Sequence, residues 1–246
     1  LRPAGVARGR YPRRVTHRLQ WPGLTGVIVD LDGTLVDTLD DFHAALARML
    51  ATLGHGPVDR ALVERSIGKG SEHLIASVLA HVGAPPDTDG TAWRAYQAAY
   101  REVNGQQARL YPGVREGLTA LAGGGLRRAC LTNKPTAFAR ELLQRLGLAD
   151  DFEKVFGGDA FERKKPDPLP VLRTCAALGC EPGHVLVVGD SSNDAAAARA
   201  AGCPVILVTY GYNHGEPVQA VNADAFVDSM ADLPAAWQGV RARCQG

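Results

Sequence analysis

The chain has 246 residues, 46% hydrophobic and 22% charged, which suits one large or two small globular domains with a substantial core. Its net charge of +1 hides an asymmetry, because residues 1 to 18 hold six arginines and no acid. Residues 19 to 246 hold 21 basic and 26 acidic residues, and this acidic body argues against a nucleic-acid partner, which needs a clustered basic surface.

The first 23 residues contain Arg, Pro and Gly without a hydrophobic period, and they predict a disordered basic arm or a wrongly assumed start of translation. Contact of this arm with nucleic acid or an anionic surface is the less favoured alternative.

No apolar run approaches about 18 residues and no secretory signal is recognisable, so we expect a cytoplasmic protein with no membrane partner. The five cysteines form no C-x-x-C pair, which argues against disulfides and zinc.

Four short apolar runs predict buried strands. They comprise residues 26 to 30, 127 to 133, 184 to 190 and 203 to 211. Apolar runs without alternation are typical of parallel strands that are covered on both faces. Helical patterns that close on a glycine separate them, over residues 135 to 147, 168 to 179 and 191 to 202. The alternation predicts an α/β fold with a doubly wound parallel sheet.

Residues 38 to 105 interrupt this alternation. They contain four amphipathic helical patterns and no convincing strand, which predicts an all-α domain inserted after the first strand. The sheet domain would then comprise residues 24 to 37 and 106 to 246. The linkers near residues 36 to 40 and 106 to 112 are predicted hinges, with the helical insertion acting as a lid.

The candidate site residues stand at or just beyond predicted strand ends, where ligands bind in open parallel sheets. They are Asp30, Asp32, Gly33, Thr132, Asn133, Asp190, Asn193 and Asp194, with Lys165 in the KKPDP loop. Three clustered carboxylates repel one another unless a cation neutralises them, and a ligand set made only of oxygen favours Mg²⁺ over zinc or copper. A phosphate could then be held by Mg²⁺, the Lys165 ammonium and the Thr132 hydroxyl.

Each of these residues has a simpler structural explanation when it is taken singly. An Asp after a strand is commonly a turn or cap residue, Thr132 suits a strand, and a loop lysine is usually solvated. The ordered set D-x-D-G-T, L-T-N, K-P and G-D-x-x-x-D favours function over these explanations, because each piece falls where the predicted fold requires it.

The segments VDLDGTLVDT (29 to 38), LTNKP (131 to 135), KKPDP (164 to 168) and VVGDSSNDAAAARAAG (187 to 202) resemble the four motifs of the haloacid dehalogenase superfamily. The resemblance covers about residues 24 to 235 and implies a Rossmann-like core with a cap. It implies that Asp30 is a nucleophile forming an aspartyl-phosphate and that Asp32 is a general acid and then a base. It also implies that Mg²⁺ is bound by Asp30, Asp190 and the Asp32 carbonyl.

Further roles follow from the same resemblance. Thr132 and Lys165 would bind phosphate, together with Gly33 and Asn133, while Asp194 and Asn193 would support the site. An Asp at position 32 favours phosphate-ester chemistry within the superfamily, but it does not separate a phosphatase from a phosphomutase.

The loop Ser66 to Ser71 (SIGKGS) lies between two predicted cap helices. Its backbone N–H groups and Lys69 could meet a small anion, so Gly68, Lys69 and Gly70 are candidate substrate contacts. A plain helix-to-helix turn is the alternative.

Three outer segments resemble the phosphoglycolate phosphatase subfamily. They are LYPGV (110 to 114), KKPDPLP (164 to 170) and VTYGYNHGEP (208 to 217). This resemblance implies hydrolysis of a small phosphate monoester, 2-phosphoglycolate. We expect a monomer or a homodimer, and the sequence leaves the choice between them open. Pyrophosphate or a sugar phosphate as substrate, phosphomutase chemistry, and a non-catalytic phosphate-binding role are the alternatives.

Overall fold

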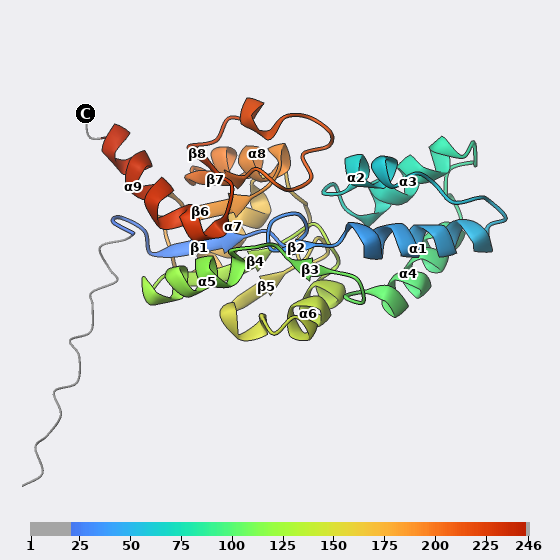
Figure 1. Ribbon diagram of the computed structural model, residues 1–246, viewed down its shortest axis with the longest axis horizontal. Coiled ribbons are helices and arrows are strands. Elements are labelled where there is room, and N and C mark those ends of the chain that lie inside the picture. Colours follow the sequence, from blue (N-terminus) through green and yellow to red (C-terminus); the bar gives the residue numbers. More distant parts are fainter. Residues whose placement is uncertain (1–20, 245–246) are drawn as a thin grey trace, which may run out of the picture.

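The computed structural model describes residues 21–244, and its centre is a six-stranded parallel sheet in the order β5-β4-β1-β6-β7-β8 (Figure 1). The strands are β1 (Gly26–Val29), β4 (Arg127–Leu131), β5 (Lys154–Phe156), β6 (Val185–Gly189), β7 (Val205–Val208) and β8 (Ala225–Val227). The strand order runs outward in both directions from β1, which confirms the predicted doubly wound sheet. The four predicted strands are present as β1, β4, β6 and β7, whereas β5 and β8, of three residues each, were not predicted.

Helices cover both faces of the sheet. They are α5 (Val114–Gly123), α6 (Thr136–Arg145), α7 (Leu169–Leu178), α8 (Ser192–Ala201) and α9 (Leu233–Cys244). Val27 and Val29 of β1 pack in one hydrophobic cluster with α5, α6 and α9, while Ile28 packs in another with α7 and α8. Successive strand side chains point to opposite faces, so an uninterrupted apolar strand serves both clusters.

The inserted helices form a cap at the end of the sheet domain opposite α9 (Figure 1). They are α1 (Leu39–Thr52), α2 (Arg60–Ser66), α3 (Ser71–His81) and α4 (Thr91–Val103). Their buried faces make a third hydrophobic cluster, in which Met49 and Tyr96 are fully enclosed. Phe138 and Tyr212 of the sheet domain join this cluster, so the cap and the sheet domain share packed apolar surface.

The chain passes between the sheet domain and the cap along a short two-stranded ribbon. Its strands, β2 (Val36–Asp37) and β3 (Arg109–Leu110), pair antiparallel within the two predicted hinge linkers. Asp41 of α1 is buried and accepts hydrogen bonds from the amides of Gly105 (2.6 Å) and Gln107 (2.8 Å). A single carboxylate therefore ties the outgoing and returning linkers together, and their action as hinges stays a prediction.

The N-terminal boundary of the packed structure lies before the predicted one. Trp21, placed in the predicted basic arm, is 2% exposed and its indole N–H donates to the carbonyl of Ala120 (3.2 Å). The arm through residue 20 lies outside the described residues. Short 3₁₀ turns complete the chain at Ala149–Asp151, Pro182–His184, Val218–Ala220 and Met230–Asp232. Within residues 21–244, no helix combines the length and apolar character needed to cross a membrane.

Candidate active site

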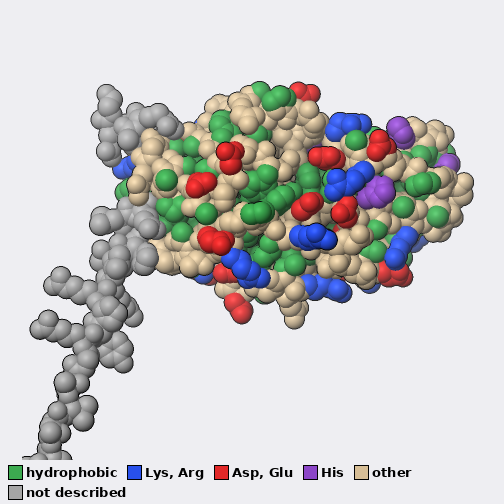
Figure 2. Space-filling view, in the orientation of Figure 1, with side chains coloured by type: hydrophobic (Ala, Val, Ile, Leu, Met, Phe, Trp, Pro, Cys, Tyr) green, Lys and Arg blue, Asp and Glu red, His purple; other side chains and the backbone are tan. Residues whose placement is uncertain are grey.

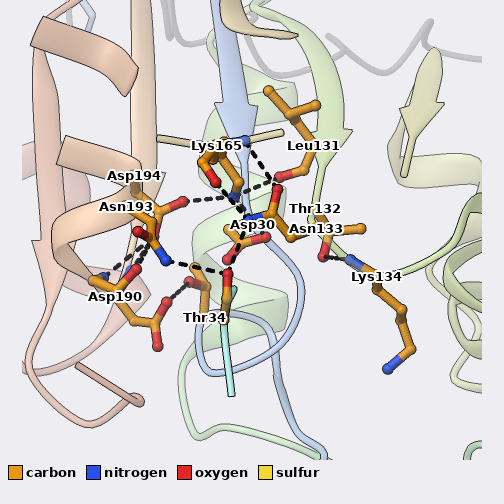
Figure 3. Close-up of polar contacts among 12 residues, drawn as sticks. Asp30, Thr34, Leu131, Thr132, Asn133, Lys134, Lys165, Asp190, Asn193 and Asp194 are labelled. Atoms are coloured by element: carbon orange, nitrogen blue, oxygen red, sulfur yellow. Dashed lines mark hydrogen bonds and ion pairs between the residues drawn. The ribbon is translucent and has the colours of Figure 1, made fainter. Parts of the chain in front are cut away.

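Three buried carboxylates meet at the carboxyl ends of two neighbouring strands (Figure 3). Asp30 follows β1, Asp190 follows β6, and Asp194 lies in the first turn of α8. Strands β1 and β6 are paired in register, so the residues that follow them are adjacent. One oxygen from each carboxylate lies within 4.8 Å of the other two.

The start of α8 explains why Asp194 points into this cluster. Asp194 and Ser191 form a capping box, in which Oδ2 of Asp194 accepts from the Ser191 hydroxyl (2.8 Å) and amide (3.2 Å). The other oxygen, Oδ1, lies 2.6 Å from Nζ of Lys165. Asp194 therefore starts the helix and also positions the lysine.

Lys165 carries the positive charge of the cluster. Its ammonium contacts Oδ1 of Asp194, Oδ1 of Asp30 (2.9 Å) and the carbonyl of Leu131 (2.9 Å). Burial alone would lower the pKa of Lys165, but the two carboxylates outweigh it and hold that pKa above its usual range. The ammonium therefore remains charged beside Asp30.

One lysine does not balance three carboxylates. Burial raises the pKa of Asp30 to about 7 against the opposing charge of Lys165, and the Asp194 and Asp32 charges add to the rise. Burial likewise raises the pKa of Asp190, reinforced by Asp194 and Asp30. Raised pKa values at clustered acids mark a site that a cation would stabilise, and a donor set made only of oxygen fits a hard divalent ion.

Asp190 is held from both sides. Its Oδ2 accepts from the amide of Tyr212 (2.6 Å), and its Oδ1 lies 3.3 Å from the Thr34 hydroxyl. Gly33 faces it with a positive φ of 85°, and a Cβ built there would lie 2.1 Å from Oδ2 of Asp190. The amide of Gly33 donates to the carbonyl of Val36 (2.9 Å), so Gly33 shapes the loop around Asp190, and its predicted contact with phosphate stays a prediction.

Asn133 joins three parts of the site. Its Oδ1 accepts from the amide of Lys165 (3.0 Å), and its Nδ2 donates to the carbonyls of Lys165 (2.8 Å) and Gly68 (2.9 Å). Thr132, one residue earlier, is buried at the end of β4, and its hydroxyl oxygen accepts from the amide of Lys134 (3.2 Å). The Asn133 amide thus positions Lys165, while the Thr132 hydroxyl retains a donor proton for a ligand.

Asp32 points to the cap side of the site rather than into the carboxylate cluster. Its Oδ1 lies 2.9 Å from Nζ of Lys134 and accepts from the Thr38 hydroxyl (2.8 Å). Sequence reasoning assigned Lys134 no role, although the residue stands inside the LTNKP segment. A lysine in a loop is normally solvated, so only its burial in the folded chain distinguishes it.

The loop between α2 and α3 closes over the site. The carbonyl of Gly68 accepts from Asn133 and from Nδ2 of Asn193 (3.2 Å), which ties the cap to both β4 and α8. Gly70 lines the cavity beneath this loop, whereas Lys69 is exposed and does not line it. The contact of Lys69 with substrate therefore stays a prediction, and the position of Lys69 outside the cavity does not support it.

The cavity beneath the loop between α2 and α3 is small, about 20 Å³. Its lining comprises Asp30, Asp32, Phe42, Ile67, Gly68, Gly70, Ser71, Leu74, Thr132, Asn133 and Lys134. A larger groove of about 680 Å³ lies alongside, between the cap and α6, and shares Asn133 with it. Lys164 and Glu72 pair across the boundary of sheet domain and cap (2.6 Å). On the face shown in Figure 2, basic and acidic side chains lie side by side near the middle of the molecule.

Comparisons with known proteins agree with this architecture. The family model described as haloacid dehalogenase-like hydrolase matches residues 27–208. Phosphoglycolate phosphatase from Nitrosospira multiformis is 44% identical over 84% of this chain and 92% of its own length. The phosphoglycolate phosphatase of Thiobacillus denitrificans is 42% identical over 85% and 93%.

A solved structure extends the similarity to three dimensions. The crystal structure of a predicted phosphoglycolate phosphatase from Haemophilus somnus 129PT superposes with a TM-score of 0.82 at 33% identity, covering 86% of this chain and 96% of that one. The parallel sheet, its helical cap and the buried acids at the strand ends define a capped α/β enzyme. The chain belongs to the haloacid dehalogenase-like hydrolase family.

Proposed function

We propose that this chain is a Mg²⁺-dependent phosphatase that hydrolyses 2-phosphoglycolate to glycolate and inorganic phosphate. The observation that carries the proposal is the Asp30 carboxylate, which lies 2.9 Å from the buried ammonium of Lys165 inside a three-carboxylate cluster. The names of the 42–44% identical relatives support phosphoglycolate as the substrate.

The residues divide the reaction into two displacements. Asp30 attacks phosphorus, the bond from phosphorus to the ester oxygen breaks, and Asp32 gives its proton to the leaving oxygen. The Asp32 carboxylate then takes a proton from water, which attacks the aspartyl-phosphate, and release of phosphate restores Asp30. The Thr132 hydroxyl binds a phosphoryl oxygen through both steps, and the positive charge of Lys165, held beside Asp30, stabilises the charge of the phosphoryl group.

Mg²⁺ would be held by Asp30, Asp190 and the backbone carbonyl of Asp32, with Asp194 placing Lys165 beside it. When bound there, the ion lessens the repulsion between an anionic nucleophile and an anionic phosphate. The burial and mutual repulsion of these acids support a cation at this position.

A substrate panel tests the proposed function. Phosphate release would be measured with 2-phosphoglycolate, pyrophosphate, glucose 1-phosphate and p-nitrophenyl phosphate, with Mg²⁺ and with EDTA. We expect Mg²⁺-dependent release and the highest kcat/KM for phosphoglycolate. A preference of about tenfold for a sugar phosphate would contradict the substrate. Isomerised sugar phosphate without free phosphate would indicate a mutase, and no turnover of any ester would indicate a binding protein.

The nucleophile has its own test. Asp30→Asn should lower kcat by at least roughly 1000-fold, because a neutral amide cannot form the aspartyl-phosphate. Asp32→Asn should slow both half-reactions. The control, Asp40→Asn, removes an exposed carboxylate that pairs with Arg60 on the cap and should leave kcat unchanged. Ordinary activity in the Asp30 variant would refute the assignment.

A further inference from the structure

Lys134 is an enclosed lysine between the sheet domain and the cap. Its ammonium contacts Oδ1 of Asp32 (2.9 Å) and the hydroxyl of Tyr100 (2.5 Å), and its side chain is 1% exposed. It also lies over the rings of Phe42 (4.3 Å) and Tyr100 (4.7 Å). Two cap aromatics and one carboxylate thus hold the Lys134 ammonium against the cavity.

The two buried lysines of the site differ in how their donors are used. An ammonium has three N–H donors, and those of Lys165 are matched by Asp194, Asp30 and the Leu131 carbonyl. Lys134 has two such acceptors, and no described residue accepts its third N–H. The side chain of Lys134 extends away from Asp30 and Lys165 (Figure 3). Lys134 therefore serves a different part of the cavity and retains a donor for a ligand.

The cavity around Lys134 combines one cation with carboxyl groups and apolar walls. Lys134 is the one cationic side chain among the described residues that line it, whereas the nucleophile Asp30 contributes negative charge. A second anion beside the phosphate would be repelled by Asp30 and by the phosphate itself unless it met this cation. Phe42, Ile67 and Leu74 give the cavity apolar walls, so a charged group within it has Lys134 as its cationic partner among the described lining residues.

We propose that Lys134 is the specificity-determining residue that binds a second anionic group of the substrate, and that the enzyme selects short phosphate esters with a negative charge next to the phosphate. This inference rests on the proposed phosphatase function. The substrate carboxylate takes the third N–H of the ammonium while Asp32 and Tyr100 keep the lysine in place. Lys69, which the sequence analysis named as a candidate substrate contact, is exposed and does not line this cavity.

A comparison of two esters measures the contribution of the second anionic group to turnover. 2-Phosphoglycolate and ethyl phosphate share a two-carbon chain and differ in the carboxylate, and the quantity measured is the ratio of their kcat/KM values. Each ratio is taken on one protein sample, so a loss of folded enzyme cancels. Lys134→Met should lower this ratio roughly 10- to 100-fold, as expected for a lost hydrogen bond between charged groups. Lys134→Arg, which keeps the positive charge, should retain most of the wild-type ratio of kcat/KM values.

Two further variants serve as controls. Lys69→Met removes the competing cation of the cap loop, and Lys154→Met removes an exposed charge on β5. Both should leave the ratio within about threefold of the wild-type value. If Lys134→Met turns over neither ester, isothermal titration calorimetry measures the affinity of that variant for each ester, and the ratio of the two affinities replaces the ratio of kcat/KM values. If the Met variant does not fold, Lys134→Gln is used instead.

The outcomes separate this inference from the function on which it rests. A wild-type protein that does not prefer phosphoglycolate over ethyl phosphate would overturn the proposed substrate. A wild-type preference that persists in Lys134→Met, or that disappears in Lys69→Met instead, would overturn the role of Lys134 alone. Equal losses on both esters in Lys134→Met would also overturn it, because they would show a purely structural role.

Discussion

The backbone amide of Tyr212 donates a 2.6 Å hydrogen bond to Oδ2 of Asp190. The hydroxyl of the same tyrosine accepts from the amides of Thr38 (3.1 Å) and Leu39 (3.2 Å) and donates to Asp37. Tyr212 therefore connects the carboxylate cluster at the end of β6 with the first turn of the cap. Its ring packs among the cap side chains, so one residue belongs to the site, the linker and the cap.

Tyr212→Phe should lower the free energy of unfolding by about 1–3 kcal/mol, because the Thr38 amide loses its buried acceptor and the Leu39 amide keeps only Oδ1 of Asp37 (3.2 Å). The backbone amide remains, so the Mg²⁺ concentration for half-maximal activity should not change. Urea denaturation and a Mg²⁺ titration measure the two effects. Tyr210→Phe, which removes only the hydrogen bond to the Thr34 carbonyl (2.8 Å), is the control and should cost less. Wild-type stability in the Tyr212 variant would argue against a stabilising connection between the Tyr212 hydroxyl and the start of the cap.

Gly33→Ala should weaken metal binding as well as stability. The added methyl group would collide with Oδ2 of Asp190, in a backbone conformation that already disfavours side chains. Gly54→Ala is a matched control, since Gly54 has a similar φ of 78° and no atom within 4 Å of the added carbon. We expect each variant to lose about 1 kcal/mol of stability from backbone strain. The Gly33 variant alone should need at least roughly tenfold more Mg²⁺ for activity.

Asp41→Ala should destabilise the protein by about 1–3 kcal/mol, because the amides of the half-buried Gly105 and of Gln107 would lose a buried, charged acceptor. Asp40→Ala, at the neighbouring position, removes only an exposed ion pair with Arg60 and should change stability by less than about 1 kcal/mol. Urea denaturation of the two variants measures the difference. Equal losses of stability in the two variants would show that the hydrogen bonds of Asp41 stabilise the protein no more than a surface ion pair does.

The stability that Asp30 and Asp190 contribute to the metal-free protein should fall as the pH rises from about 4 to about 7. His73 and His214, whose pKa values burial lowers, contribute the opposite trend as the pH approaches 6.5. Asp30 ionises near its ordinary value of 3.8 in the unfolded chain and near 7 in the folded protein, so the folded state binds more protons within this window. Asp190 shifts in the same direction. Lys165 has a raised pKa in the folded state, so its stabilisation is present throughout this window and is lost only at much higher pH.

Mg²⁺ should reverse this loss. At a saturating concentration we expect the melting temperature to rise by roughly 5–10 °C at pH 8, where the carboxylates are ionised. The rise should be much smaller at pH 5, where protons occupy the folded site. Differential scanning calorimetry with Mg²⁺ and with EDTA measures both values, and Asp190→Asn should reduce the difference. A Mg²⁺ effect that is equal at both pH values would contradict this linkage.

The amino-acid sequence by itself determined the parallel sheet, most of its helices and the strand ends that carry the site. Apolar runs such as residues 185–189, and helices that end one or two residues before Gly147, Gly179 and Gly202, are encoded by neighbouring residues. The strands β5 and β8 escaped prediction because three-residue strands at the sheet edges carry too few side chains to establish a pattern.

Only the tertiary structure decided which side chains meet. Lys134 and Asp32 lie 102 positions apart, and Tyr212 and Asp37 lie 175 apart, so no local pattern indicates their pairing. The burial of Lys134 and the exposure of Lys69 also follow from how the cap closes on the sheet domain. Local sequence sets hydrophobic periods and helix ends, whereas contacts over such separations form only when the whole chain packs around its cores.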